Sequence, residues 1–284
     1  MDAICNNEPV ILIGTQRSGT TWLGRILSND RDVAYWPEPR HIWTHGNAYR
    51  KDDILSAEDA TPKIRAWIRR KVERFVRRRG KRRLLEKTPS NCLRLPFVRA
   101  VFPEARIVLL IRDGRSVLNS TDRILEAGVP THRIVRRAME TPLSEWPAYV
   151  PRTVSTLKRK IMRQKLSYWG PRPPGWQEWL AVHTPIEVLV RQWSATITRA
   201  VEDAEGDPGV LKIRYERLVR TPDAEMRRLV EFCRLTDGDA LVQRASESAR
   251  ADRADAWRSE VEPAQLESVR SILEPALNRV GYQW

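Results

Sequence analysis

The chain has 284 residues, 41% of them hydrophobic, and 11 tryptophans, which excludes general disorder and allows one large α/β domain with insertions. Its formal net charge of +14 predicts attraction to anions: a nucleotide, an acidic glycan, nucleic acid or an anionic lipid surface. No stretch approaches the ~20 apolar residues of a membrane span, and the start lacks the pattern of a signal peptide, so we expect a soluble protein. Three cysteines without metal-ligand spacing (Cys5, Cys92 and Cys233) indicate reduced thiols and a cytoplasmic protein.

A glycine loop follows the first apolar segment. Val10–Ile13 has the pattern of a buried strand, and an apolar-periodic helix follows the loop. The loop has P-loop spacing, with Gly14, Gly19, Thr20 and Thr21 at its fixed positions. Such a loop binds a phosphate through backbone N–H groups and the positive helix end, although an ordinary strand-to-helix turn can look similar. Thr20 stands where ATP and GTP hydrolases have a lysine that contacts the β- and γ-phosphates, and this absence disfavours a nucleoside triphosphate as the ligand. The cation of this loop is Arg17 instead.

Prolines on both sides of Glu38 predict a stiff, extended backbone shortly after this loop. A carboxylate held rigidly beside a phosphate site is a candidate general base. A surface acid in a proline-rich turn is the alternative.

Residues 62–83 have the apolar period of a helix, and the other side of this helix is dense in arginine and lysine. The apolar stripe predicts core packing. The basic face either contacts a polyanion or an anionic membrane, or is simply solvated.

A second strand is expected at residues 82–87, before a turn stopped by Pro89. Glu86 and Lys87 then lie at its carboxyl end, where open α/β sheets bind ligands. Glu86 is therefore a second candidate base, with a local surface ion pair to Lys87 as the alternative.

The apolar run Ile107–Ile111 predicts a strand covered on both faces of a parallel sheet. Arg112 ends it, Asp113 can cap the next helix, and Ser116 and Ser120 share one face of that helix. A strand-end arginine and a helix hydroxyl can bind a second phosphate.

Prolines and tryptophans recur over residues 138–185, which we interpret as an insertion or lid on the acceptor side. Its tryptophans either stack on an acceptor or pack beneath a long loop. The helical period returns at Pro185, and a last strand with its turn is expected over 210–219, before a helix near 223–235.

Two of these motifs resemble the sulfotransferases that use 3′-phosphoadenosine 5′-phosphosulfate (PAPS). Gln16–Leu23 is similar to their 5′-phosphosulfate loop, and an arginine followed eight residues later by a serine, here Arg112 and Ser120, is similar to their 3′-phosphate motif. The Glu38 segment resembles the Glu-Pro segment of Golgi carbohydrate 6-O-sulfotransferases and the region of the proposed base of tyrosylprotein sulfotransferases. The Glu86 turn resembles that of heparan 3-O-sulfotransferases.

The resemblance implies a P-loop-type parallel sheet flanked by helices, in a single domain of residues 1–284 with a variable acceptor-side insertion at about 138–185. It implies PAPS as donor, 3′-phosphoadenosine 5′-phosphate (PAP) as product, and no metal. The implied donor contacts are Arg17, Ser18, Gly19, Thr20, Thr21, Trp22, Arg112, Ser120 and Tyr215. A degraded form of the tryptophan loop that closes over PAPS adds Trp257 and Arg258.

The expected activity is sulfuryl transfer to an acceptor hydroxyl, on a carbohydrate or glycolipid, with Glu38 or Glu86 as base and Lys87 and Arg17 offsetting charge. A P-loop small-molecule kinase is one alternative, and a non-catalytic basic module that binds polyanions is another. No specific nucleic-acid partner is expected, and the sequence does not indicate an oligomeric state.

Overall fold

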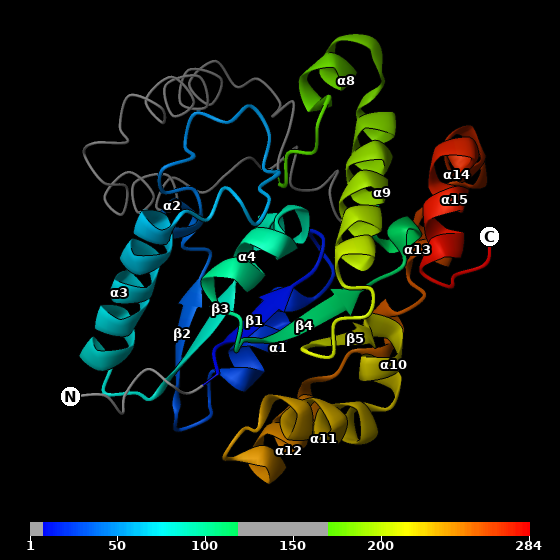
Figure 1. The fold of residues 1–284 in the computed structure, drawn as a ribbon. Helices are drawn as coiled ribbons and strands as arrows, with labels where there is room; N and C mark the ends of the chain where they lie inside the picture. Colours follow the sequence, from blue (N-terminus) through cyan, green and yellow to red (C-terminus); the bar gives the residue numbers. More distant parts are fainter. Residues whose placement is uncertain (1–7, 119–169) are drawn as a thin grey trace, which may run out of the picture.

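The computed structural model describes residues 8–118 and 170–284, which form a five-stranded sheet with helices on both sides (Figure 1). The strands are β1 (Val10–Ile13), β2 (Val33–Pro37), β3 (Arg83–Lys87), β4 (Arg106–Ile111) and β5 (Val210–Arg214). Their spatial order is β2-β3-β1-β4-β5, and every neighbouring pair is parallel. The predicted α/β class with a parallel sheet is confirmed.

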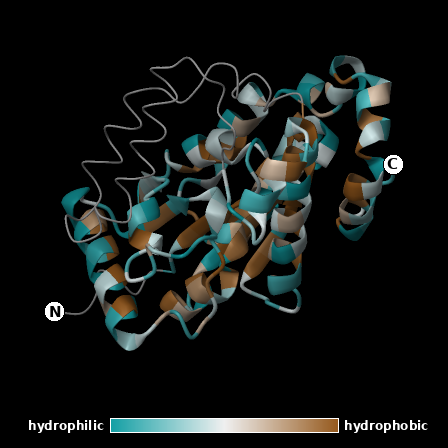
Figure 2. Cartoon of the chain, turned by 90° about the horizontal axis from the view of Figure 1, so that it is seen from above, coloured by the Kyte–Doolittle hydropathy of each residue, from teal (hydrophilic) through white to brown (hydrophobic). Residues whose placement is uncertain are grey.

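The central strands are apolar throughout because both of their faces are covered. Ile11 and Ile13 of β1 pack into one hydrophobic core, whereas Val10 and Leu12 pack into a second core on the other face of the sheet. Figure 2 shows the same arrangement, with hydrophobic colour at the sheet and hydrophilic colour on outward helix surfaces.

Helices on the first face include α3 (Pro62–Arg78), α4 (Leu95–Val101), α9 (Pro185–Asp203) and α15 (Arg270–Arg279). Helices on the second face are α1 (Thr20–Leu27), α10 (Tyr215–Arg220), α11 (Pro222–Cys233) and α12 (Gly238–Ser248). The remaining helices are short: α2 (Arg40–Trp43), α8 (Trp176–Val182), α13 (Trp257–Glu260), α14 (Pro263–Ser268), and the 3-10 turns η1 (Pro89–Leu93) and η3 (Ala251–Arg253). In the described ranges, no helix combines the length and apolar character needed to cross a membrane.

The predicted helix over 62–83 is α3, but it ends at Arg78, five residues earlier than expected. Gly80 adopts a left-handed φ of 62°, and the N–H of Lys81 donates to the carbonyl of Val76 at 3.2 Å. A glycine in this conformation terminates a helix by satisfying its last carbonyls. The chain is thereby freed to enter β3.

The expected helix at Pro185 is confirmed as α9, which begins with a capping box. The Thr184 side chain accepts from the N–H of Glu187, and the Glu187 carboxylate accepts from the N–H of Thr184 at 2.8 Å. Within the expected insertion, residues 138–169 lie outside the described part of the chain, as do Trp146 and Trp169. The single domain with a variable insertion at about 138–185 stays a prediction.

Candidate active site

A candidate site residue lies at or just after the carboxyl end of every strand of the sheet. The loop with Arg17 follows β1, Glu38 follows β2, Lys87 ends β3, Arg112 follows β4, and Tyr215 follows β5. Because the strands are parallel, these residues share the carboxyl edge at which open α/β sheets bind ligands.

Two glycines give the loop after β1 its shape. A Cβ on Gly14 would lie 2.6 Å from both the Leu110 carbonyl oxygen and Ser18 Oγ, and one on Gly19 would lie 2.6 Å from the Tyr215 ring. Gly19 also has a φ of 94°, which strains any residue with a side chain. The first helical bond runs from the Leu23 N–H to the Gly19 carbonyl, which leaves the N–H groups of the first helical turn, residues 20–22, to point toward an anion.

Buried polar groups around this loop fit an anionic ligand. Ser18 is fully buried, and its hydroxyl has no hydrogen-bond partner within the described chain. Burial, and next the charge of Arg112, lower the pKa of the Arg17 guanidinium. An anion between these two guanidinium groups would relieve their repulsion and give the Ser18 hydroxyl an acceptor. The phosphosulfate group predicted from the sequence therefore fits the loop.

Arg112 is held firmly beside the loop. Its two terminal nitrogens donate to the carbonyl oxygens of Arg17 at 2.9 Å and Arg253 at 2.8 Å, and its guanidinium lies 4.2 Å from the centroid of the Tyr215 ring. Its predicted partner Ser120 lies outside the described residues. Ser116, four positions earlier in the sequence, is buried, and its hydroxyl has no partner in the described ranges. The same i,i+4 spacing makes it an additional candidate for the phosphate site.

Trp22 and Tyr215 form an aromatic wall next to Arg112. Their rings meet edge to face with centroids 6.4 Å apart, and Trp22 Nε1 donates to Ser248 Oγ at 3.2 Å. A rigid aromatic surface beside a phosphate site suits an adenine or ribose ring.

The Trp257 ring belongs to the hydrophobic core and is 8% exposed. It is contacted by the guanidinium groups of Arg115 at 4.1 Å and Arg258 at 4.6 Å from its centroid. The ring thus supports the segment that follows Arg253, whose carbonyl binds Arg112. Direct contact of Trp257 and Arg258 with the nucleotide stays a prediction.

Glu38 and Lys87 form an ion pair at the edge of the sheet. Lys87 Nζ donates to Glu38 Oε1 at 2.8 Å, while the Glu38 N–H donates to the Lys87 carbonyl, also at 2.8 Å. The side chains are 17% exposed for Glu38 and 4% for Lys87, so the carboxylate is the member that reaches solvent. Glu38 has a φ of 55° and Arg17 one of 65°, two of three such non-glycine residues in the described chain. Strained backbone of this kind clusters at active sites.

Glu86 faces the protein interior. It is 1% exposed and accepts hydrogen bonds from the Thr88 hydroxyl and from Asn91 Nδ2 at 3.1 Å. Burial raises the pKa of its carboxyl group to about 7. This geometry anchors η1 to the end of β3 and leaves no open approach for an acceptor.

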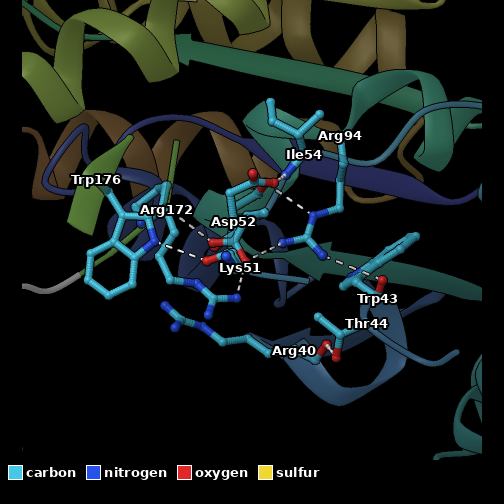
Figure 3. Close-up of polar contacts among 12 residues, drawn as sticks. Arg40, Trp43, Thr44, Lys51, Asp52, Ile54, Arg94, Arg172 and Trp176 are labelled. Carbon is cyan, nitrogen blue, oxygen red and sulfur yellow. Dashed lines mark hydrogen bonds and ion pairs between the residues drawn. The ribbon is translucent and has the colours of Figure 1, made fainter. Parts of the chain in front are cut away.

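A buried ionic cluster near Arg40 of α2 was not predicted from the sequence (Figure 3). Asp53 accepts from the N–H of Arg172 at 2.9 Å and from its guanidinium at 2.7 Å, and forms an ion pair with Arg94 at 3.3 Å. Burial by itself would raise the pKa of Asp53, but the charges of Arg94 and Arg172 outweigh it and lower that pKa to about 2. Asp53 and Arg172 are 119 positions apart, so no local pattern could reveal their contact.

The segment after Gly170 joins this cluster to the phosphate loop. Gln16 of the loop donates to Gln192 of α9, and Gln192 donates to the Pro171 carbonyl at 2.7 Å. Farther along, Trp176 Nε1 donates to the Lys51 carbonyl at 3.0 Å. The described end of the expected insertion thus contacts both the loop after β1 and the Asp53 cluster.

The fold and the site together define a P-loop-type group-transfer protein with an anion-binding loop and a neighbouring carboxylate–lysine pair. Residues 9–159, more than half of the chain, match the sulfotransferase family. The chain belongs to this family, which confirms the predicted enzyme class and supports PAPS as donor and PAP as product. Among residues 8–118 and 170–284, no group of three His, Cys, Asp or Glu could hold a metal ion, and a metal-free reaction stays a prediction.

Curated relatives agree with this assignment. The chain is 23% identical over 314 residues to protein-tyrosine sulfotransferase A of Caenorhabditis elegans, covering 99% of this chain and 69% of the relative. It is 23% identical over 308 residues to nodulation protein NoeE of Sinorhizobium fredii (strain NBRC 101917 / NGR234), covering 96% and 65%. The chain therefore spans about two thirds of the length of these relatives.

Solved structures show the same fold. The sulfotransferase domain of the Synechococcus PCC 7002 olefin synthase superposes with a TM-score of 0.59 at 16% identity, covering all of this chain and 98% of that domain. The sulfotransferase domain of the curacin biosynthetic pathway gives 0.55 at 14% identity, covering 97% and 98%.

Proposed function

We propose that this sulfotransferase moves the sulfuryl group of PAPS to an acceptor hydroxyl by in-line displacement, with Glu38 as the general base. The observation that carries the proposal is the Glu38–Lys87 ion pair beside the phosphate loop. The acceptor oxygen forms the new bond to sulfur, while the bond from sulfur to the bridging phosphate oxygen breaks and PAP leaves with its electron pair. The Glu38 carboxylate takes the hydroxyl proton.

The other residues at the carboxyl edge of the sheet would bind the donor and offset its negative charge. The loop N–H groups, Ser18, Thr20 and Thr21 would hold the phosphosulfate, and Arg17 and Lys87 would offset negative charge that builds up on the departing oxygen. We also propose how the 3′-phosphate is bound. Arg112 would donate charge-assisted hydrogen bonds to it, and the hydroxyls of Ser120 and Ser116 would donate neutral ones.

Glu38 is preferred to Glu86 because a base must reach the proton it removes. Glu38 follows the edge strand β2 and is partly exposed, whereas both oxygens of Glu86 already accept hydrogen bonds in the interior. Lys87 also holds the Glu38 carboxylate in place at the carboxyl edge of the sheet.

For the acceptor we propose a sugar hydroxyl on a carbohydrate or glycolipid, supported by the resemblance of the Glu38 and Glu86 segments to carbohydrate sulfotransferases. A tyrosyl hydroxyl is the second candidate, because one curated relative is named a protein-tyrosine sulfotransferase. We further propose that the basic face of α3 contacts an anionic partner, either a polyanion or a membrane. A cytoplasmic location completes the proposal and is supported by Cys92 and Cys233, both buried free thiols.

Calorimetric titration tests the donor site directly. We expect PAP to bind tightly, adenosine 5′-phosphate to bind weakly because it lacks the 3′-phosphate, and ATP with Mg²⁺ to bind more weakly than PAP. Binding of ATP–Mg²⁺ with no binding of PAP would overturn the proposal and favour a kinase. If none of the three ligands bound, that result would also overturn the proposal and would favour a non-catalytic module that binds polyanions.

A further inference from the structure

The outer face of α3 concentrates the positive charge of the chain. Eleven of the 21 residues from 62 to 82 are Lys or Arg, and one is acidic, so this stretch supplies ten of the fourteen net positive charges. Ile68, Val72 and Val76 face the core. The opposite side of the helix is an exposed row of five cations, here called the α3 cationic row: Lys63, Arg70, Arg74, Arg77 and Arg78.

This row gathers five exposed cations on one side of a single helix. In residues 8–118 and 170–284, none of its five members has an acidic partner within 4.0 Å. Many exposed arginines elsewhere are paired with an acid, such as Arg227 with Asp223 at 3.1 Å and Arg270 with Glu274 at 3.0 Å. Arg74 instead has like charges three and four positions away, an arrangement that destabilises a helix. A bound anion would relieve this repulsion.

The shape of the row favours a linear partner. From Lys63 to Arg78 a helix rises about 22 Å, and the cations follow one side of it. Four of the five are arginines, whose planar guanidinium groups bind carboxylate and sulfate groups through paired hydrogen bonds. A sugar chain with a repeating acidic group matches both the length and the chemistry.

The surroundings of the row disfavour a lipid surface. Helices that lie on membranes insert an apolar face, but the apolar face of α3 is packed in the core. The exposed large hydrophobic side chains of the described residues are Tyr49 and Val182, and neither is on α3.

The direction of α3 links the row to the active site. The helix follows α2, which itself follows Glu38, and it runs from the carboxyl edge of the sheet toward the opposite edge (Figure 1). A sugar chain that presents one hydroxyl to Glu38 can therefore continue along α3. We infer that the α3 cationic row binds an acidic polysaccharide acceptor, an inference that rests on the proposed function and narrows its acceptor class.

Heparin fragments of increasing length are the probe, and the test variant replaces Arg70, Arg74 and Arg77 by Gln. The control variant replaces Arg227, Arg228 and Arg244 by Gln, which removes the same charge from exposed sites on α11 and α12. We expect the test variant to bind long fragments at least about tenfold more weakly and to lower the slope of log affinity against log salt by about one per cation removed. The control variant should retain the wild-type affinity and slope.

Three results would overturn the inference: equal weakening in both variants, no binding of heparin by the wild type, or α3-dependent binding of phosphatidylserine vesicles in place of heparin. Calorimetry with PAP on the same samples separates this inference from the proposed function. If the test variant loses heparin binding but keeps its PAP affinity, the result supports heparin binding by the α3 cationic row. If the wild type does not bind PAP, the sulfotransferase proposal is refuted, whether or not heparin binds.

Discussion

Replacing Glu38 by Gln tests the proposed base most directly. The amide keeps the length of the side chain and can still accept a hydrogen bond from Lys87 Nζ, 2.8 Å away, but it cannot take a proton. We therefore expect kcat to fall by about 10²–10⁴, the usual range for a general base. The almost fully buried Lys87 ammonium also loses its counter-charge, so the free energy of unfolding should fall by about 1–3 kcal/mol.

The assay is transfer of labelled sulfate from PAPS to the best acceptor from a panel of sugars and phenols, with PAP affinity as the check on folding. Glu86→Gln is the matched control, because the Gln oxygen can accept from Asn91 Nδ2 while the Gln amide nitrogen donates to the Thr88 hydroxyl in a reversed bond. We expect this control to retain kcat within a few-fold. The reasoning is refuted if Glu38→Gln turns over at the wild-type rate while Glu86→Gln does not.

Three further outcomes follow from the described contacts. Arg112→Ala should weaken PAP binding by about 10- to 150-fold in calorimetry, which corresponds to the loss of one hydrogen bond to a charged group. If the variant weakened the binding of adenosine 5′-phosphate by the same factor, that result would contradict a role for Arg112 in binding the 3′-phosphate. The pKa of Glu86 is about 7 in the fold and 4.5 as its ordinary value, so the native state binds this proton more tightly. Stability should thus fall by about 3 kcal/mol as pH rises from 4.5 to 7, and urea unfolding of Glu86→Gln should lack that slope. Asp53→Asn leaves buried Arg94 without its counter-charge and should cost about 3–5 kcal/mol of unfolding free energy, against less than about 1 kcal/mol for the exposed control Asp223→Asn.

The loop and the strand-end residues could be predicted because their signals are local. The spacing of Gly14 and Gly19 indicates a tight turn into a helix, and the apolar run before Arg112 indicates a strand buried on both faces. Parallel strands then bring their carboxyl ends together without further information. The family resemblance was carried by these same short segments, and the family match confirms it.

The apolar period and the charge pattern of the sequence did not predict where helix α3 ends. The period of α3 continued through its basic residues, and only the left-handed Gly80 shows where the helix stops. The basic face itself was visible in the sequence. Which of its cations meet an acid depends on the tertiary structure: Arg69 pairs with Glu104 at 2.7 Å, whereas the α3 cationic row has no acidic partner within the described residues.

The sequence by itself determined the fold class, the phosphate loop and the pair of candidate bases, because each depends on residue types at short, fixed spacing. Only the tertiary structure distinguished the surroundings of Glu38 from those of Glu86, since burial depends on what packs around a strand end. It also brought Asp53 to Arg172 and Gln16 to Gln192, contacts between residues more than a hundred positions apart. Such contacts leave no periodic trace in the sequence, because they are fixed by the packing of whole helices and strands.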